Sequence, residues 1–280
     1  MSMIKKIAWQ NSRKKSSPNI ILFDMDGTLT PPREQFDLSL LEGLRSLSTV
    51  AEIGILSGSN YSYIQEQMSH ILTKSELKFK THILPCNGTQ YYPPLREANA
   101  RHEKLFSVFM KDELGDQNYR ELIKIILELQ EHISKKSIPL SGNFIDYRES
   151  MVNWCPIGRS ASSSERKEFI EIDNQSGLHS MRTEYLDRLR LKLKRLGWND
   201  KITCALGGDT SFDIYPSGWD KTFALRHFEN KEIWFVGDRC DEGGNDKALY
   251  DLLKPSGRSY CTEGPAHTKH IIKQIIMDII

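Results

Sequence analysis

Short apolar runs, each followed by a polar loop and a segment of helical periodicity, occur near both ends of this chain. The runs at 19–24 and 52–58 precede helical patterns at 36–47 and 61–72, and a further run lies at 232–238. Continuous apolar runs that alternate with helices are typical of a parallel sheet covered on both faces. The sequence therefore predicts an α/β fold built on a parallel sheet.

The middle of the chain has a different pattern. A long helical pattern over 101–137 is broken around Gly115, and residues 143–155 alternate in polarity as two antiparallel strands do. The other elements expected here are helices at 164–173 and 178–196 and paired strands at 202–208 and 211–216. This block predicts an inserted α+β domain with an antiparallel sheet.

These patterns divide the chain into three parts. Residues 18–95 and 218–280 are expected to form one core domain, and residues 96–217 are expected to form a cap domain inserted into it. Residues 1–17 are basic and polar, without the apolar stretch of a signal peptide. We therefore expect a disordered tail at 1–17.

Composition limits the classes of partner. The 280 residues carry a formal net charge of +1, which provides no general field for nucleic acid or an anionic membrane. No apolar run approaches the roughly 20 residues of a membrane span. Five scattered cysteines without C-x-x-C spacing argue against a disulfide framework or a zinc site and favour a reducing cytosol. We expect a cytoplasmic protein that binds neither nucleic acid nor a membrane.

Two of the apolar runs end in carboxylates. Asp24 ends the first run, Asp26 follows two residues later, and Asp238 ends the run at 232–238. Because parallel strands present their carboxyl ends at one edge of a sheet, these carboxylates are expected to surround one point. Carboxylates that close together repel unless a cation lies between them, and oxygen-only ligands suit Mg²⁺. The alternative for Asp24 and Asp26 is an ordinary Asp-Gly turn, and the alternative for Asp238 is a solvated loop at the start of a helix.

Three further side chains would suit a phosphate. Lys221 begins a helical run that leads into the second acidic strand, where its charge would balance a carboxylate nucleophile and a phosphate. Ser57 and Ser59 follow the second apolar run, and their hydroxyls would donate to a phosphate. A surface lysine and a Ser-Gly turn with a helix cap are the alternatives.

Four segments resemble, in order, the motifs of the haloacid dehalogenase phosphotransferase superfamily: FDMDGTLT, ILSGS, DKTFALRHF and FVGDRCDEGGND. The resemblance implies a Rossmannoid core in which Asp24 is the nucleophile and becomes an aspartyl phosphate. It implies that Asp26 is the general acid and base, and that Lys221 belongs to the catalytic set. It also implies that Mg²⁺ is held by Asp24, by the backbone carbonyl of Asp26 and by Asp238.

Three arginines occur in the middle block. Arg148 lies on a strand-like segment, Arg159 in a Pro-Ile-Gly-Arg turn, and Arg166 in the first turn of a helix that Ser162 and Glu165 would open as a capping box. The alternative for each arginine taken alone is a solvated surface residue. Helix starts favour anions, however, and arginine suits bidentate phosphate recognition. As a set they predict a second phosphate site, which a mutase acting on a bisphosphorylated sugar requires.

The stretch from about residue 19 to residue 250 resembles the eukaryotic-type α-phosphomannomutases. The segments that carry this resemblance are FDMDGTLTPPR, QEQM, NFIDYRESMVNWCPIGRS, GGDTSFDIYPSGWDK, LRHFEN and GDRCDEGGND. The resemblance implies that the sugar phosphate is bound by Arg33, Arg148, Arg159, Arg166, Ser211 and Asp213. The arginines would take the distal phosphate, while Ser211 and Asp213 would bond sugar hydroxyls.

Three positions depart from the family pattern. Cys86 stands where the family usually has glutamate, and Asp209 stands where it tends to have glutamine. Leu252 stands where the carboxylate of a second cation site is expected, with Asp251 one residue before it. These departures leave open the preference between mannose and glucose phosphates and the presence of a second cation site.

The leading hypothesis from the resemblance is an enzyme that interconverts mannose 6-phosphate and mannose 1-phosphate and feeds GDP-mannose synthesis. The resemblance implies a hexose 1,6-bisphosphate both as intermediate and as catalytic activator. It also implies a homodimer through the cap, with the helical segment at 101–137 as a candidate interface. A sugar-phosphate phosphatase of the same superfamily and a sugar-phosphate-binding protein with a decayed site are the alternatives.

Overall fold

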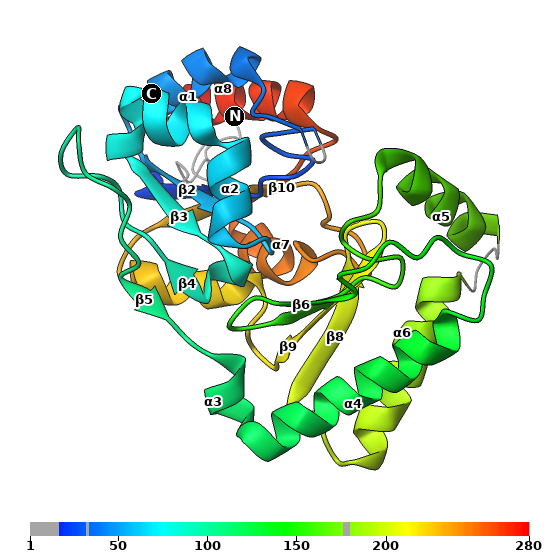
Figure 1. Ribbon diagram of the computed structural model, residues 1–280. Helices are drawn as coiled ribbons and strands as arrows, with labels where there is room; N and C mark the ends of the chain where they lie inside the picture. Colours follow the sequence, from blue (N-terminus) through cyan, green and yellow to red (C-terminus); the bar gives the residue numbers. More distant parts are fainter. Residues whose placement is uncertain (1–16, 32–33, 176–179, 280) are drawn as a thin grey trace, which may run out of the picture.

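The computed structural model describes residues 17–31, 34–175 and 180–279. Figure 1 shows two main sheets, each with helices packed on it. Arg33 and nearly all of the tail predicted at 1–17 lie outside the described residues. The predicted α/β fold with a parallel sheet is confirmed, and so is the separate antiparallel sheet.

The larger sheet is parallel throughout and has the order β11-β10-β1-β2-β3. Its strands are β1 (Ile20–Phe23), β2 (Glu52–Leu56), β3 (Thr81–Leu84), β10 (Ile233–Gly237) and β11 (Ser259–Cys261). Strand β1 lies at the centre, where Ile20 pairs with Glu52 on one side and with Ile233 on the other. Segments that are far apart in the sequence therefore meet at β1.

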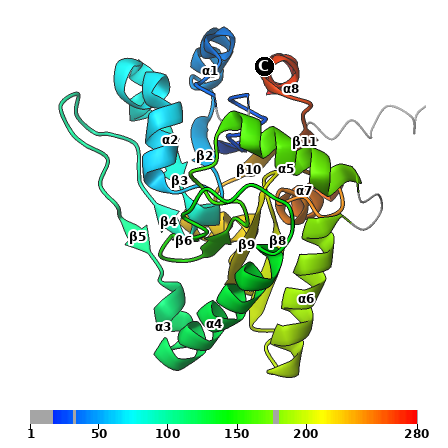
Figure 2. The same cartoon turned by 45° about the vertical axis from the view of Figure 1, so that its right-hand side comes forward.

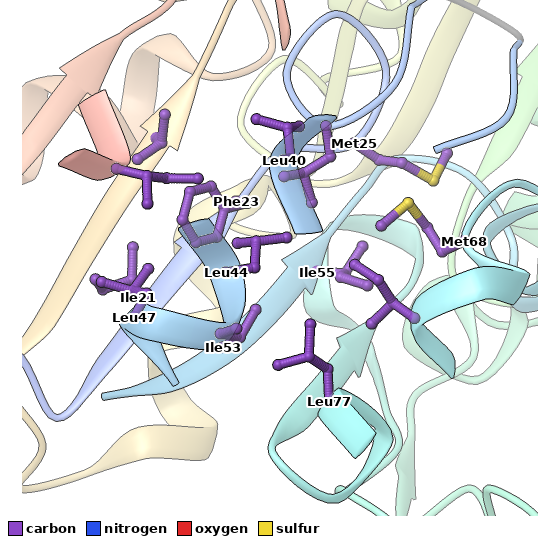
Figure 3. Close-up of a cluster of buried hydrophobic side chains, with 14 of the residues drawn as sticks. Ile21, Phe23, Met25, Leu40, Leu44, Leu47, Ile53, Ile55, Met68 and Leu77 are labelled. Carbon is purple, nitrogen blue, oxygen red and sulfur yellow. The ribbon is translucent and has the colours of Figure 1, made fainter. Parts of the chain in front are cut away.

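The side chains of β1 alternate between two apolar cores. The helices that cover this sheet are α1 (Leu41–Leu47), α2 (Tyr61–Gln67), the 3-10 helix η6 (Lys221–Phe228), α7 (Lys247–Leu253) and α8 (Pro265–Ile279). Ile21 and Phe23 pack with residues of α1, α2 and α8, in the cluster drawn in Figure 3. Ile20 and Leu22 pack with residues of η6 and α7 on the other face. Burial on both faces explains the continuous apolar run of β1. It also holds the strand in place, and so fixes the position of Asp24, which follows it.

The second sheet is antiparallel and has the order β6-β7-β9-β8. Its strands are β6 (Ile145–Tyr147), β7 (Val152–Trp154), β8 (Ile202–Gly207) and β9 (Ser211–Pro216). Trp154 and Phe212 belong to an apolar core that the sheet shares with nearby helices. Their strand neighbours Asn153 and Asp213 point to the opposite face because successive side chains alternate across a strand. One face of this sheet is therefore polar.

Helices pack on the apolar face of the antiparallel sheet. They are α3 (Met110–Leu114), α4 (Asp116–Ile133) and α6 (Met181–Arg195), and α5 (Ser163–Gln175) contacts α6. Figures 1 and 2 both show α4 and α6 side by side. Among the described residues, no helix combines the length and the apolarity that a membrane crossing requires.

The helix predicted over 101–137 is wrong in its first part. Strand β5 (Phe106–Ser107) pairs there with β4 (Gln90–Tyr91), and the helical segment begins only at Met110. The backbone N–H of Leu105 donates to the carbonyl of Tyr91 at 2.9 Å, so this stretch extends the β4–β5 pair. Aromatic and β-branched residues favour extended structure when such a partner strand is available.

Shorter helical turns complete the connections. They are η2 (Leu38–Leu40), η3 (His70–Lys74), η4 (Glu76–Phe79), η5 (Cys86–Gly88) and η7 (Lys254–Ser256). Turn η5 follows β3 and leads into β4, at the point where the chain leaves the parallel sheet.

Candidate active site

Asp24 occupies the first position after β1, and only 5% of its surface is exposed. Its backbone N–H donates to the carbonyl of Val236 at 2.9 Å, which continues the parallel ladder to β10. Gly27 has a φ of +82°, and a Cβ placed there would lie 2.3 Å from Oδ2 of Asp238. The glycine of the first motif therefore permits Asp238 to approach the turn that follows Asp24.

Lys221 is fully buried and joins two carboxylates. Its Nζ lies 2.5 Å from Oδ1 of Asp24 and 2.5 Å from Oδ1 of Asp246. Helix η6 begins at this lysine, and Asp220 caps it by accepting from the N–H of Thr222 at 2.8 Å. Burial alone would lower the pKa of Lys221, but the two carboxylates outweigh it and raise that pKa. The ammonium group is therefore charged beside Asp24.

Three carboxylates crowd this point. Asp24, Asp238 and Asp246 each offer an oxygen within 4.8 Å of the others. Burial raises the pKa of Asp24 well above its ordinary value, and the charges of Asp246 and Asp238 raise it further against the effect of Lys221. Burial and the charge of Asp246 also raise the pKa of Asp238. An additional cation would relieve this repulsion.

The hydrogen bonds suggest where a cation fits. Both oxygens of Asp246 already accept bonds, from Nζ of Lys221 and from the backbone N–H of Arg239 at 3.0 Å. By contrast, Oδ1 of Asp238 is buried and accepts no hydrogen bond from the described part of the chain. Hard oxygen ligands of this kind suit Mg²⁺. Asp24 and Asp238 are therefore the carboxylates that would hold it, while Asp246 holds Lys221.

Asp26 lies at the rim of this acidic group. Its Oδ1 accepts a hydrogen bond of 3.0 Å from the hydroxyl of Tyr63 in α2. Its carboxylate is absent from the group that could share an ion. This agrees with a separate role for the side chain, and the contact of its backbone carbonyl with Mg²⁺ stays a prediction.

A cavity of about 560 Å³ lies between the two sheets and is lined by residues from both. The predicted residues that line it from the side of the parallel sheet are Asp24, Asp26, Ser57, Ser59 and Asp238. Those that line it from the side of the antiparallel sheet are Arg148, Arg159, Arg166, Ser211 and Asp213. Lys221 lies beneath it, bonded to Asp24. The structure thus brings every predicted site residue that it describes to one cavity or to its floor.

The serines after β2 form a compact loop. Ser57 is 3% exposed, and its Oγ accepts a hydrogen bond of 3.0 Å from the backbone N–H of Ser59. Arg148, from the end of β6, donates to the carbonyl of Gly58 at 3.1 Å and to Oδ2 of Asp146 at 2.9 Å. The two sheets therefore touch at this loop, and the arginine predicted to bind the distal phosphate helps to position it.

Arg166 organises the loop that carries Arg159. The predicted capping box is confirmed, since the N–H of Ser162 donates to Glu165 at 2.7 Å and the N–H of Glu165 to Ser162 at 3.3 Å. From this helix start, Arg166 donates to the carbonyl of Arg159 at 2.8 Å and to Oγ1 of Thr210 at 2.9 Å. Its guanidinium therefore stabilises the walls of the cavity as well as lining it.

Asn153 completes the polar face of the antiparallel sheet. It is 2% exposed, and its Nδ2 donates to Oδ1 of Asp213 at 2.7 Å and to Oγ of Ser211 at 3.0 Å. These bonds orient the two residues that the sequence resemblance assigns to sugar hydroxyls. Asn153 was not among the residues predicted for the site, although a polar residue between the apolar Val152 and Trp154 marks the other face of a strand.

Comparison with known proteins decides the family. A family model described as eukaryotic phosphomannomutase matches residues 40–278. A phosphomannomutase of Dendrobium officinale is 36% identical over 242 residues, which are 86% of this chain and 88% of that protein. A phosphomannomutase of Schizosaccharomyces pombe is 33% identical over 266 residues, which are 94% of this chain and 96% of that protein. The chain belongs to the eukaryotic phosphomannomutase family.

Solved structures share the fold of this phosphomannomutase family member. The IMP-bound, N-terminally truncated IMP-nucleotidase of Plasmodium falciparum matches it with a TM-score of 0.63 and 15% identity. The match covers 94% of this chain and 69% of the other. At such identity the likeness shows the fold alone, and that fold is the haloacid dehalogenase-like one expected from the motifs.

Two of the residues expected to depart from the family pattern, Cys86 and Leu252, lie within the described part of the chain. Cys86 is 1% exposed, and burial raises the pKa of its thiol to about 12. Its Sγ donates to the carbonyl of Arg148 at 3.6 Å, so the thiol is a packing group and not a nucleophile. Leu252 is 56% exposed, and the neighbouring Asp251 accepts from Lys247 at 2.5 Å.

Proposed function

We propose that this chain interconverts mannose 6-phosphate and mannose 1-phosphate. The observation that carries the proposal is one cavity with Asp24 and Asp238 on one wall and Arg148, Arg159 and Arg166 on the other. A mutase needs both walls, because its substrate presents one phosphate to the nucleophile while the other is held at a distance. The cavity volume of about 560 Å³ lies within the usual range for small-molecule sites. The phosphomannomutase names of the relatives support mannose phosphates as substrates.

In the proposed reaction, a phosphoryl group carried on a side-chain oxygen of Asp24 passes to a hydroxyl of a bound hexose monophosphate. Asp26 takes the proton of that hydroxyl, and the product is a hexose 1,6-bisphosphate. The bisphosphate then reorients, and the freed carboxylate of Asp24 attacks its other phosphorus. Asp26 returns the proton to the departing sugar oxygen. The isomeric monophosphate leaves, and Asp24 is phosphorylated again.

Charges around the nucleophile support this chemistry. Mg²⁺ held by Asp24, Asp238 and the backbone carbonyl of Asp26 would supply positive charge to the oxygens of the transferring phosphoryl group. Lys221 keeps its ammonium beside Asp24, and so limits the repulsion between the carboxylate and an arriving phosphate. We assign hydroxyl donors to that phosphate at Ser57 and Ser59, which line the same wall.

The distal end is assigned to the antiparallel sheet. Arg148, Arg159 and Arg166 would hold the second phosphate, together with Arg33, and Ser211 and Asp213 would bond sugar hydroxyls. The buried amide of Asn153 supports the assignment of Ser211 and Asp213 to sugar hydroxyls, because it donates to the side chains of both and holds them in place. In this proposal residues 18–95 and 218–280 form the core domain, and residues 96–217 form the cap.

The cellular setting is also part of the proposal. We assign the chain to the cytoplasm as a homodimer that associates through the cap, with hexose phosphates as its partners. Its product mannose 1-phosphate would feed GDP-mannose synthesis, and a catalytic amount of hexose 1,6-bisphosphate would prime the unphosphorylated enzyme.

A product assay separates the mutase from a phosphatase of the same fold. The protein is incubated with mannose 1-phosphate, Mg²⁺ and a catalytic amount of hexose 1,6-bisphosphate, and products are followed by phosphorus NMR. The mutase yields mannose 6-phosphate, and omission of the bisphosphate slows its appearance. Accumulation of free mannose and inorganic phosphate without mannose 6-phosphate would refute the proposal in favour of the phosphatase.

Arg159→Ala is expected to weaken transfer to sugar more than hydrolysis of the aspartyl phosphate. A charge-assisted phosphate contact contributes roughly 1.5–3 kcal/mol, so isomerisation should fall by about 10- to 150-fold. Hydrolysis by water needs no distal phosphate and should change little. Arg188→Ala, at a residue of α6 that is 42% exposed at its side chain and does not line the cavity, is the control and should leave both rates unchanged. Equal loss of both activities in Arg159→Ala would argue against a distal phosphate site.

A further inference from the structure

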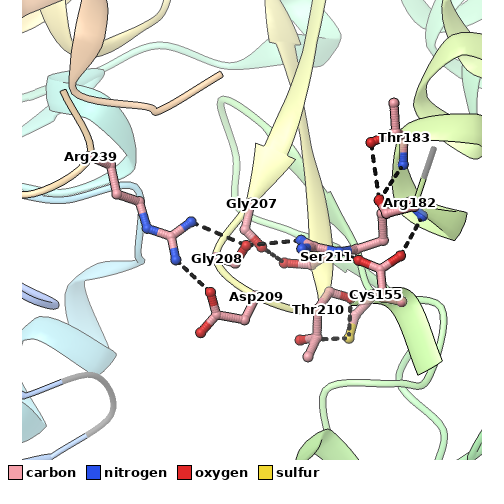
Figure 4. A network of polar contacts seen from close by, with 11 residues as sticks. Cys155, Arg182, Thr183, Gly207, Gly208, Asp209, Thr210, Ser211 and Arg239 are labelled. Atoms are coloured by element: carbon pink, nitrogen blue, oxygen red, sulfur yellow. Dashed lines mark hydrogen bonds and ion pairs between the residues drawn. The ribbon is translucent and has the colours of Figure 1, made fainter. Parts of the chain in front are cut away.

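The turn between β8 and β9 contacts the loop after β10 through Arg239, whose bonds to Gly208 and Asp209 are drawn in Figure 4. Arg239, the residue after Asp238, donates from Nη2 to Oδ1 of Asp209 at 2.6 Å. It also donates from Nη1 to the carbonyl of Gly208 at 3.2 Å. Asp209 and Arg239 both line the cavity that holds Asp24. One guanidinium therefore joins the parallel and antiparallel sheets in the cavity that holds the nucleophile.

The turn is fixed to its own side of the cavity. Arg182, at the start of α6, donates to the carbonyl of Gly208 at 3.0 Å and to Oδ2 of Asp173 at 2.8 Å. Arg166 holds the next residue of the turn, since its Nη1 donates to Oγ1 of Thr210 at 2.9 Å. Because these bonds stay within one part of the chain, the turn would move together with α5 and α6.

The loop is fixed to the other side. The backbone N–H of Arg239 donates to Oδ2 of Asp246, the same carboxylate whose Oδ1 accepts from Lys221. Lys221 in turn contacts Asp24. A short chain of bonds therefore runs from the nucleophile to the guanidinium that contacts the turn.

Burial distinguishes the two arginines that hold Gly208. The Arg182–Asp173 pair is buried, with side-chain exposures of 14% and 2%. The Arg239–Asp209 pair is solvated, with side-chain exposures of 38% and 57%. Solvated ion pairs contribute little and are easily broken. Of these two pairs, Arg239–Asp209 is therefore the one that can open, while the Arg182–Asp173 pair within the antiparallel part persists.

Arg148, beside β6, also joins the two parts, since it donates to the carbonyl of Gly58 at 3.1 Å. The residues that follow it make further contacts where the chain passes from one part to the other. Thr89 and Ser150 share a hydrogen bond of 2.5 Å, and Gln90 donates to Glu149 at 3.2 Å. These residues adjoin the β4–β5 pair, which Figures 1 and 2 place well away from the turn after β8. The β4–β5 region is thus suited to act as a hinge, and the Arg239–Asp209 pair lies apart from it.

We propose that the Arg239–Asp209 ion pair is a closure latch for the catalytic cavity. When formed, it holds the β8–β9 turn against the loop after β10 and excludes water from phosphorylated Asp24. When it is released, the cavity opens and the bisphosphate can reorient or exchange. The inference rests on the proposed phosphoryl transfer.

Amide hydrogen exchange of the full chain tests the latch without turnover. Asp209→Asn and Arg239→Gln should each speed exchange by about two- to five-fold in residues 207–211 and in residues 239–246. The double variant should be no faster than either single variant, because both remove one contact. The charge-exchanged double variant, Asp209→Arg with Arg239→Asp, should recover protection. Unchanged exchange in the single variants, or additive effects in the double variant, would overturn the proposal.

The chain offers a matched control. Lys192 in α6 and Glu128 in α4 form an ion pair of 2.7 Å with side-chain exposures of 37% and 63%, close to those of the latch. This pair joins two helices of the same part and does not reach the parallel sheet. Lys192→Gln should leave exchange in 207–211 and 239–246 unchanged, and an increase there would show that any lost ion pair has this effect.

A second readout tests the exclusion of water. With mannose 1-phosphate and bisphosphate, the ratio of inorganic phosphate released to sugar phosphate isomerised should rise by about two- to five-fold in Asp209→Asn. An unchanged ratio alongside faster exchange would overturn the water-excluding role. If the wild-type protein isomerised no sugar phosphate, the proposed function would fail, while the exchange experiment would still decide whether the ion pair holds the turn.

Discussion

Asp24→Asn is expected to reduce isomerisation of mannose 1-phosphate by about 10⁴-fold or more, as removal of a catalytic nucleophile commonly does. A neutral amide does not form the acyl phosphate that the proposed reaction requires. The fold should survive, because asparagine keeps an oxygen for Lys221 and removes one charge from a crowded group of carboxylates. Mass spectrometry after mixing with hexose 1,6-bisphosphate should find one added phosphoryl group on the wild-type protein and none on the variant.

Binding separates loss of chemistry from loss of the site. Calorimetric titration of Asp24→Asn with mannose 1-phosphate should give an affinity within a few-fold of the wild-type value, since the distal wall is intact. Asp187→Asn serves as the control, because this aspartate lies on the outer surface of α6 with 67% of its side chain exposed. Full activity in Asp24→Asn would contradict the role assigned to the nucleophile.

Lys221→Met is expected to lower the free energy of unfolding by about 3–5 kcal/mol. The lysine has no exposed surface and contacts Asp24 and Asp246 at 2.5 Å each. Its loss leaves these carboxylates buried beside Asp238 without their cation. Urea unfolding followed by circular dichroism measures the change. Mg²⁺ should stabilise this variant more than the wild-type protein, because removal of the ammonium strengthens the attraction of the acidic group for a cation.

The double variant Lys221→Met with Asp246→Asn isolates the electrostatic cause. Removal of one carboxylate together with the lysine restores the charge balance, so part of the lost stability should return. Both single and double variants create a similar apolar packing change at 221, and only the charge differs between them. If the double variant were as unstable as Lys221→Met, packing and not charge would explain the loss.

The arrangement of Asp24 and Asp238 could be foreseen because it follows from backbone geometry. Both residues follow strands that are buried on two faces, and parallel strands bring their carboxyl ends to one edge. A second phosphate site at Arg148 and Arg166 was expected from residue type and local context, and the family resemblance assigned both residues to the sugar phosphate. Periodicity indicates which face of a strand is polar, but it carries no information about which residues of another sheet will oppose that face.

The features that escaped prediction depend on long-range side-chain contacts. Asp246 was not among the predicted site residues, yet packing of α7 turns its carboxylate toward Lys221. The contact between Asp209 and Arg239 likewise exists only once the two sheets are packed together. The extended segment before Met110 was misread as helix, because a strand partner at Gln90–Tyr91 overrides local periodicity.

The central position of β1 has a consequence for synthesis in the cell. The strand that precedes Asp24 pairs on one side with β2 and on the other with β10, which the ribosome makes only after the entire antiparallel sheet. During translation β1 therefore has one neighbour and an open edge, which is a hazard for aggregation. Lys221, Asp238 and Asp246 also emerge late, so the nascent chain carries Asp24 for most of its synthesis without the groups that would make it reactive.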